Sequence, residues 1–365
     1  MSLHLQNIDH IVGGEPHISG INLELEPGSF NVLLGRTLAG KTTLMRLMAG
    51  LEQPTRGRIY MDGKDVTGVS VRKRNVSMVY QQFINYPSLN VYNNIASPLK
   101  LAKASKQEID KRVRETAAML GIDHLLDRLP LELSGGQQQR TAMGRALVKD
   151  ADLILFDEPL VNLDYKLREA LRDELRELFK ARNCIAVYAT TEPNEALALG
   201  GNTAVLHEGK LLQYGPTEQI YREPNGILSA EMFSEPPINI VPGHLTANEI
   251  TFDQDIHFPC DVALRNLPAG PYRFGVRASH VSLQPNAADD LELEVEVEVA
   301  EISGSETFLH VRHSLFPLVL HLLGIHTPKV NQRLKVYFPT HKLFVFDQQG
   351  SIVHTPETRG GNQHG

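Results

Sequence analysis

Long hydrophobic runs and closely spaced cysteines are both missing from this 365-residue chain. No apolar run approaches the roughly 18 to 20 residues that a bilayer-spanning helix needs. The N-terminus, MSLHLQNIDH, lacks the basic start and apolar core of an export signal. Cys184 and Cys260 lie far apart and cannot make a disulfide framework or a metal site. We therefore expect a cytosolic protein, which would work at a membrane only by docking on the helices of other subunits.

Basic charge is also scarce, because 36 Lys and Arg stand against 43 Asp and Glu, for a net charge of −7. A general nucleic-acid binder normally presents a basic face, so this balance argues against a nucleic-acid partner. The hydrophobic share of 42% and the charged share of 22% are ordinary for a globular protein. The length is large for one core, so we expect two domains.

Residues 1–235 alternate short β-rich runs with longer helical patterns, which indicates an α/β domain with a largely parallel sheet. We place a helical subdomain at about residues 85–150. Apolar spacing with charged outer faces predicts helices over 106–120 and 165–181. Buried strands are predicted at residues 31–35 and 152–159, and further strands at 184–191 and 202–215.

The pattern changes after MFSEPPINIVPG at 232–243, a proline-rich joint. Strict alternation of apolar and polar residues follows, for example in LELEVEVEVAEI at 291–302, which predicts strands with one buried face. We expect a smaller all-β domain, a barrel, over residues 236–353. The tail at 354–365 is predicted to be disordered.

The motif Gly35-x-x-x-x-Gly40-Lys41-Thr42 lies between a predicted strand and a predicted helix. Backbone N–H groups of such a loop and the start of its helix point at phosphates. Lys41 adds a charge for the β- and γ-phosphates, and the Thr42 hydroxyl can ligate Mg²⁺. A chance glycine-rich turn is the alternative, and the strand–loop–helix placement disfavours it. The predicted ATP-binding residues here are Gly35, Arg36, Thr37, Leu38, Ala39, Gly40, Lys41, Thr42 and Thr43.

The run LILFDEP places Asp157 and Glu158 at the carboxyl end of a buried strand, where open α/β sheets bind ligands. Asp157 is predicted to hold Mg²⁺, and Glu158 to orient or deprotonate an attacking water as the catalytic residue. A helix cap or solvated turn is the more common reading of an isolated Asp-Glu pair. The phosphate loop upstream favours catalysis.

The segment LSGGQQQR at 133–140 begins with a natural helix N-cap, Ser134, followed by two glycines that let a backbone approach a phosphate closely. The candidate residues are Ser134, Gly135, Gly136 and Gln137. The alternative is an ordinary capped helix start, and the segment can be a helix start and a phosphate contact at the same time.

With these motifs in order, the chain resembles the ATP-binding subunit of an ABC transporter, over its whole length. The resemblance adds Asp164 of NLD (162–164) as a nucleotide contact and Gln81 as a link between Mg²⁺, the γ-phosphate and the membrane subunit. It also implies that nucleotides sit between the phosphate loop of one subunit and the LSGGQ of another. The segment around Phe83 to Asn94 would receive a permease helix. GVRASHVSL at 275–283 is similar to a strand of the OB-like regulatory domain of carbohydrate importers.

Four stretches resemble one ATPase subunit of proteobacterial glycerol importers: LAGKTTLMRLMAGL, KRNVSMVYQQFINYPSLNVYNNIASPL, NLDYKLREALRDEL and YATTEPNEALALGGNTAVL. This resemblance implies a glycerol importer, working with ATP and Mg²⁺, two permease subunits and a periplasmic solute-binding protein. The subunit would lie on the cytoplasmic face of the bacterial inner membrane. An importer for glycerol phosphate or a sugar is the alternative. Two alternatives belong to a different functional class: a soluble ABC protein and a nucleotide-dependent regulator.

Three positions depart from the family pattern. Leu38 replaces a small residue of the loop, and only Ile11 and Val12 stand where an aromatic side chain normally stacks on adenine. Thr191 stands where the family has a histidine that contacts the γ-phosphate and the attacking water. Threonine cannot shuttle a proton near neutral pH. We expect a weak site on this chain's own loop, with its LSGGQ completing the site of an unlike partner ATPase.

Overall fold

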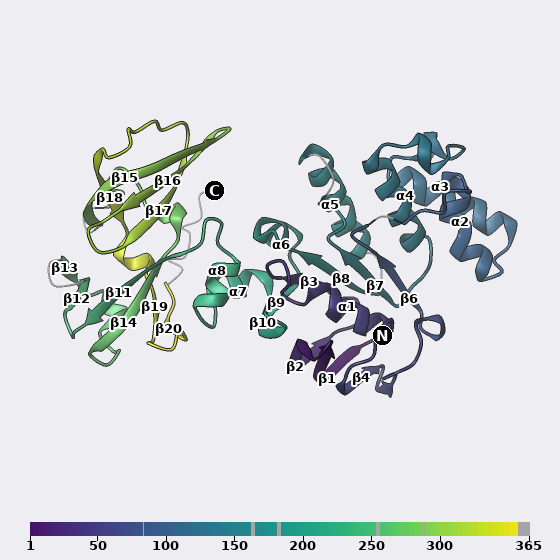
Figure 1. Cartoon of the computed structure of the whole chain (residues 1–365), viewed down its shortest axis with the longest axis horizontal. Helices are drawn as coiled ribbons and strands as arrows, with labels where there is room; N and C mark the ends of the chain where they lie inside the picture. Colours follow the sequence, from purple (N-terminus) through teal and green to yellow (C-terminus); the bar gives the residue numbers. More distant parts are fainter. Residues whose placement is uncertain (83, 162–164, 181–183, 253–255, 288–289, 357–365) are drawn as a thin grey trace, which may run out of the picture. The chain divides into compact units, whose positions relative to one another are not determined.

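The computed structural model describes residues 1–82, 84–161, 165–180, 184–252, 256–287 and 290–356 (Figure 1). The chain divides into two compact units, Met1–Thr217 and Glu218–Gly365. Among the described residues, no helix is both long and apolar enough to cross a membrane.

Two sheets form the frame of the first unit. The smaller is antiparallel, in the order β2-β1-β4-β5, and the larger has the order β10-β9-β3-β8-β7-β6. In the larger sheet every pair is parallel except β9 with β10. The strands are β1 (Leu3–Val12), β2 (Glu15–Leu25), β3 (Phe30–Leu34), β4 (Arg56–Met61), β5 (Lys64–Asp65), β6 (Val76–Val79), β7 (Leu153–Asp157), β8 (Ile185–Thr190), β9 (Asn202–His207) and β10 (Lys210–Pro216).

Helices cover the larger sheet on both faces, and this explains why β7 and β8 are buried and apolar along their whole length. Helix α1 (Lys41–Ala49) lies between the two sheets and shares one buried cluster with both. On the opposite face the Phe179 ring of α5 (Tyr165–Lys180) packs 5.6 Å from Phe156 and 5.7 Å from Phe30. The predicted strands and the two predicted helices of this unit are confirmed, with residues 202–215 forming two antiparallel strands, β9 and β10.

Three helices gather beyond the β6 edge of this sheet: α2 (Val91–Leu101), α3 (Lys106–Met119) and α4 (Gly135–Leu147) (Figure 1). They form the helical subdomain that the sequence predicts. The short helix α6 (Pro193–Leu199) follows β8.

The second unit has two sheets around one core, in the orders β13-β12-β11-β14-β19-β20 and β17-β16-β15-β18. β15 shows the predicted alternation of buried and exposed residues over most of its length. Its strands are β11 (Asn239–Leu245), β12 (Glu249–Phe252), β13 (Ile256–Pro259), β14 (Gly270–Val276), β15 (Leu291–Ser303), β16 (Glu306–Arg312), β17 (Pro317–Leu323), β18 (Arg333–Phe338), β19 (Phe344–Phe346) and β20 (Ile352–His354).

The expected barrel is not closed by a continuous ladder, because the described strands pair in two separate sheets, which side-chain hydrogen bonds join. The Asn239 amide of β11 donates to the Val319 carbonyl at 2.9 Å and accepts from its N–H at 2.7 Å. Ser282 forms the antiparallel bridge to Tyr337 of β18. These links satisfy edge groups that a continuous sheet would pair.

The second unit also contains most of α7 (Thr217–Arg222) and all of α8 (Ile227–Met232). Arg277, 4% exposed, holds this stretch: its guanidinium donates to the Tyr221 carbonyl at 2.6 Å and to the Ser234 hydroxyl at 2.7 Å. It also stacks 3.9 Å from the centre of the Tyr221 ring. The compact units therefore divide upstream of the proline-rich joint, whereas our boundary at residue 235 followed composition alone.

Candidate nucleotide site

Two glycines shape the loop between β3 and α1. A Cβ on Gly35 would lie 2.5 Å from the Leu206 carbonyl oxygen of β9 and 2.8 Å from the Cβ of Ala39. Gly40 has a φ of 97°, in the left-handed region that glycine enters without steric cost, and a Cβ there would lie 2.9 Å from Ile18. The loop therefore curls tightly against β9 and delivers the chain to the first turn of α1, where free N–H groups favour phosphate.

Leu38 stands at the exposed tip of this loop. Its φ is 68° and 94% of the residue is exposed, so burial of the side chain does not compensate for the unfavourable left-handed conformation. A residue with a Cβ loses roughly 1–2 kcal/mol in that conformation. Arg36, Thr37 and Thr42 are also exposed along the loop and the start of α1.

Lys41 begins α1 and is 5% exposed. Its ammonium donates to the carbonyls of Gly35 at 2.8 Å and Arg36 at 3.2 Å, and pairs with Oε1 of Glu158 at 3.2 Å. The ammonium thus directs two donors into the loop and one at the Glu158 carboxylate after β7. For the Lys41 ammonium, phosphate oxygens would be stronger hydrogen-bond acceptors than these neutral carbonyls.

Asp157 is the last residue of β7, and its carboxylate meets the hydroxyl that the motif assigns to Mg²⁺. The Thr42 hydroxyl lies 3.0 Å from Oδ1 and 2.9 Å from Oδ2. Burial raises the pKa of Asp157, and the hydrogen bond from Thr42 opposes this. Carboxylate and hydroxyl oxygens are hard ligands, so this pair fits Mg²⁺ completed by water and phosphate oxygens. No cluster of three or more metal-ligating side chains occurs among the described residues.

Glu158 follows directly in a strained conformation, with a φ of 47°. Such strain in a non-glycine residue is typical of functional sites. Its N–H donates to the Ala189 carbonyl at 3.1 Å, and its Oε2 accepts from the Gln81 amide at 3.2 Å. Lys41 pairs with Oε1, the other carboxylate oxygen. Glu158, the predicted catalytic carboxylate, therefore lies together with Lys41 and Gln81 at the carboxyl ends of β3, β6 and β7.

Thr190 and Thr191 end and follow β8, beside Glu158. Thr190 is buried and donates to Oε2 of Glu195 at 2.6 Å, while its hydroxyl accepts from the Glu192 N–H at 3.0 Å. Thr191 is exposed at the position where the resemblance implies a histidine.

Glu195, which the sequence analysis missed, is 7% exposed and also accepts from the Tyr188 hydroxyl at 3.2 Å. Burial raises the pKa of this carboxyl. The sequence signal that could have identified Glu195 is an acidic residue at the start of the otherwise apolar run EALAL. The Arg168 guanidinium nearby pairs with Glu192 at 2.6 Å. These contacts fix the turn after β8 that carries Thr191.

The signature segment is a complete helix cap. The Ser134 hydroxyl accepts from the Gln137 N–H at 3.4 Å, and the Gln137 side chain accepts from the Ser134 N–H at 2.9 Å. Gly135 is exposed and Gly136 half-buried at the start of α4. Within the described part of the chain, no hydrogen bond or ion pair joins this segment to the phosphate loop. The two predicted nucleotide-binding edges are therefore separate in one subunit.

Three predictions lie wholly or partly outside the described residues: Asp164 with the rest of NLD at 162–164, Phe83, and the disordered tail at 354–365, of which residues 357–365 are not described. Ile11 and Val12, at the expected adenine position, are 49% and 46% exposed at the end of β1.

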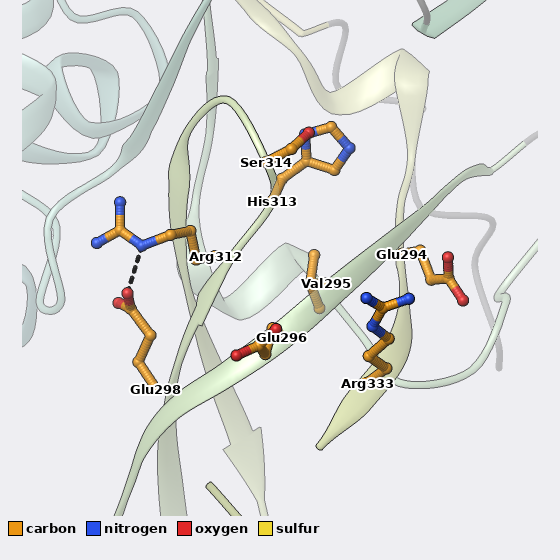
Figure 2. A pocket seen from close by; sticks show the side chains of 8 residues that line it. All are labelled: Glu294, Val295, Glu296, Glu298, Arg312, His313, Ser314 and Arg333. Carbon is orange, nitrogen blue, oxygen red and sulfur yellow. Dashed lines mark hydrogen bonds and ion pairs between the residues drawn. The ribbon is translucent and has the colours of Figure 1, made fainter. Parts of the chain in front are cut away.

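A cavity of about 360 Å³ lies on the outer face of the four-stranded sheet in the second unit (Figure 2). No prediction from the sequence falls on it. Glu296 stands between Arg312 and Arg333 in the strand register, and Arg312 pairs with Glu298. Alternating exposed charges of this kind stabilise a solvated sheet face. The lining residues are Glu294, Val295, Glu296, Glu298, Arg312, His313, Ser314 and Arg333.

The family described as ABC transporter matches residues 18–161, from β2 through the phosphate loop and LSGGQ to Glu158. Proteins named sn-glycerol-3-phosphate import ATP-binding protein UgpC are similar over almost the whole chain. Identity is 35% with that of Salmonella typhi over 348 residues, covering 94% of this chain and 97% of the relative. It is 38% with that of Rhodopseudomonas palustris (strain BisB18) over 355 residues, covering 93% and 94%.

A solved structure supports the fold of the first unit. The dimeric post-hydrolysis state of the ATP-binding cassette MJ0796, bound to ADP and Pi, matches with a TM-score of 0.54 and 28% identity. The match covers 59% of this chain and 98% of that one.

Proposed function

This chain belongs to the ABC transporter family, as an ATP-binding subunit of the carbohydrate-importer type, and from that premise we propose that it drives uptake of a small polyol, glycerol. Its cofactor is ATP with Mg²⁺, and its activity is ATP hydrolysis coupled to transport. The observation that carries the ATPase part of this proposal is the convergence of Lys41, Thr42, Asp157 and Glu158 at the strand ends.

These residues divide the work of hydrolysis between them. Bound ATP supplies the phosphoryl group that is transferred to water. Lys41 and the loop N–H groups hold the phosphates, and Thr42 with Asp157 would hold Mg²⁺. Glu158 orients the attacking water and accepts its proton, at a position already fixed by Gln81 and Lys41.

The solute is the finer part of the proposal, because the ATPase subunit does not touch it. Resemblance of four stretches to a glycerol-importer ATPase supports glycerol. The names of the relatives support glycerol 3-phosphate as the second candidate. Uptake of each labelled solute by cells with the native chain and with Ser134→Arg, which should block the stronger site, separates the two. Loss of glycerol 3-phosphate uptake alone would overturn glycerol.

We further propose that the site on this chain's own loop is weak and that its partner is an unlike ATPase subunit. Three features support weakness: the exposed Thr191 in place of histidine, the strained Leu38 and the lack of an aromatic side chain near Ile11. The complete cap at Ser134 and Gln137 supports a working role in the other subunit's site. A homodimer would carry the defect twice.

The remaining partners we propose are two permease subunits and, through them, a periplasmic solute-binding protein, with the chain on the cytoplasmic face of the inner membrane. Purification of the chain from native membranes under mild detergent tests this directly. We expect permease proteins and a second, different ABC ATPase in the isolated complex. Isolation of the chain alone, or only with itself, would overturn the assembly.

A further inference from the structure

Strand β8 lies between the two strands that lead into the nucleotide site, with β3 on one side and β7 on the other (Figure 1). Its last two carbonyls bond to the residues that follow those strands. The Ala189 carbonyl accepts from the Glu158 N–H at 3.1 Å, and the Thr190 carbonyl accepts from the Gly35 N–H at 3.4 Å. The end of β8 therefore sets the backbone position of the catalytic carboxylate and of the first glycine of the phosphate loop.

The side chain of Thr190 ties this strand end to α6. The residue is 3% exposed, and its hydroxyl donates to Oε2 of Glu195 at 2.6 Å. The same hydroxyl accepts from the Glu192 N–H at 3.0 Å, in the turn that carries Thr191. Tyr188, two residues earlier on the same face of β8, donates its hydroxyl to the same carboxylate oxygen at 3.2 Å. Glu195 thus holds β8 at two successive positions on one face.

Burial of the Glu195 carboxyl is unfavourable by itself. Burial raises the pKa of this carboxyl, and the hydrogen bond from Thr190 is the largest effect in the opposite direction. The guanidinium of Arg168 pairs with Glu192 instead, at 2.6 Å. Within the described part of the chain, two hydroxyl donors therefore compensate for the burial. An apolar side chain of similar volume would fill the position without this penalty, which indicates that the two contacts have a role beyond packing.

The phosphate loop and the catalytic carboxylate depend on the end of β8 to different degrees. The loop has further supports, because Gly35 packs closely on the Leu206 carbonyl and the Gly209 N–H donates to the loop at 3.1 Å. Glu158 has a φ of 47°, a conformation that persists only where the surroundings hold it, and its N–H is bonded to the Ala189 carbonyl. Loosening the end of β8 should therefore displace Glu158 more than the loop.

We propose that Glu195 is a positioning residue for ATP hydrolysis: by holding the Thr190 hydroxyl it fixes the end of β8 and, through it, the placement of Glu158. Because it acts through β8, it should change the rate of hydrolysis more than the affinity for ATP. The inference rests on the proposed function, since it takes Glu158 to orient the attacking water. The alternative is an acid that only stabilises the first turn of α6, where negative charge is favoured.

The test measures hydrolysis and nucleotide affinity for the same variants. Hydrolysis on this chain's own loop is measured in the reconstituted transporter that carries Ser134→Arg, in which the partner's site is blocked. Titration of the isolated chain with a fluorescent nucleotide gives the Kd. Glu195→Ala should lower kcat roughly 10- to 100-fold, the scale of a misplacement of about 1 Å in a catalytic group, and change the Kd less than about threefold.

Two further substitutions separate positioning from charge. Glu195→Gln keeps a carbonyl oxygen that can accept from both hydroxyls, so kcat should stay within about threefold of the Ser134→Arg complex. Thr190→Val removes the hydroxyl at nearly constant size and should lower kcat as Glu195→Ala does. Because the two residues act through one contact, the double variant should be no slower than the slower single variant.

Thr203→Val is the matched control, since the Thr203 hydroxyl is also buried in the larger sheet and bonds to the Thr217 hydroxyl at 2.8 Å near the start of β9. It should leave both kcat and Kd unchanged. If Glu195→Ala does not fold, the comparison of Thr190→Val with Glu195→Gln decides between positioning and charge.

Unchanged kcat in Thr190→Val, or an equal loss of kcat in Glu195→Gln and Glu195→Ala, would overturn the positioning role. Parallel loss of kcat and affinity would also overturn it, because that result describes a general loosening of the fold. A Ser134→Arg complex that binds ATP on this chain's loop but hydrolyses none would instead overturn the proposed role of Glu158 on which the inference stands.

Discussion

The phosphate-loop edge and the signature edge of the first unit are built on different principles. The signature edge is local, because one cap within four consecutive residues holds it. The loop edge is composite, since it needs β3, β6, β7 and β8 to end side by side before Lys41, Gln81, Asp157 and Glu158 can meet. Two of the three departures that the resemblance implies, Leu38 and Thr191, fall on the composite edge.

The prediction with the largest expected effect compares the ATPase rates of one variant at each edge in the reconstituted transporter. Ser134→Arg obstructs the γ-phosphate contact in the partner's site and should lower the ATPase rate about 10²-fold or more. Glu158→Gln disables water activation only on this chain's loop and should leave much of the rate. Equal losses, or robust ATPase activity from this subunit alone as a homodimer, would mean that the two sites are equivalent.

Thr191→His in the Ser134→Arg background should raise the residual ATPase rate. The partner's site is silent there, so the rate reports this chain's own loop. A group that assists proton transfer typically contributes ~10² to 10⁴ in rate, and we expect about 10² because Leu38 and the missing adenine-stacking aromatic remain. Steady-state phosphate release measures it. Thr191→Asn, which cannot exchange a proton, is the control, and an equal gain from it would refute the role of histidine.

Lys41→Ala should weaken ATP binding to the isolated chain roughly 10- to 150-fold, because it removes charge-assisted hydrogen bonds to the phosphates. It also frees Glu158 from its ion pair. Titration with a fluorescent nucleotide measures the affinity. Lys210→Ala, at the exposed start of β10, is the matched control. Unchanged affinity in Lys41→Ala would show that the loop does not hold phosphate.

Leu38→Gly should stabilise the isolated first unit by about 1 kcal/mol or less. Relief of roughly 1–2 kcal/mol of left-handed strain is offset by about 0.4–1 kcal/mol of unfolded-state entropy. Urea unfolding measures the gain. Loss of stability would mean that Leu38 makes contacts worth more than its strain.

Removal of the second unit should have the smallest effect on both edges, which lie entirely within Met1–Thr217. Chains ending after Thr217 and after Glu235 should both melt cooperatively and bind ATP with near-native affinity. The chain ending after Thr217 lacks residues 221–234, so it does not expose the surface of that segment that Arg277 covers in the full chain. An insoluble product from both would show that the units share one core.

Much of this architecture could be predicted from the chain itself. Apolar runs such as LILF and IAVYA predicted buried strands, and the period-two alternation at 291–302 predicted the one-sided β15. The unit boundary could not be predicted, because it depends on Arg277 reaching back to Tyr221 and Ser234. Proline-rich composition marks a turn in the chain, not the contacts on either side of it.

The sequence by itself determined the signature cap and the glycine positions of the phosphate loop. These are properties of consecutive residues, set by backbone sterics and hydrogen bonds within one turn. Only the tertiary structure decided that Lys41 meets Glu158, and that Thr190 is locked on Glu195 while Thr191 is exposed. Residues far apart in the chain meet only when strand order and helix packing bring them together, and no local pattern encodes that meeting.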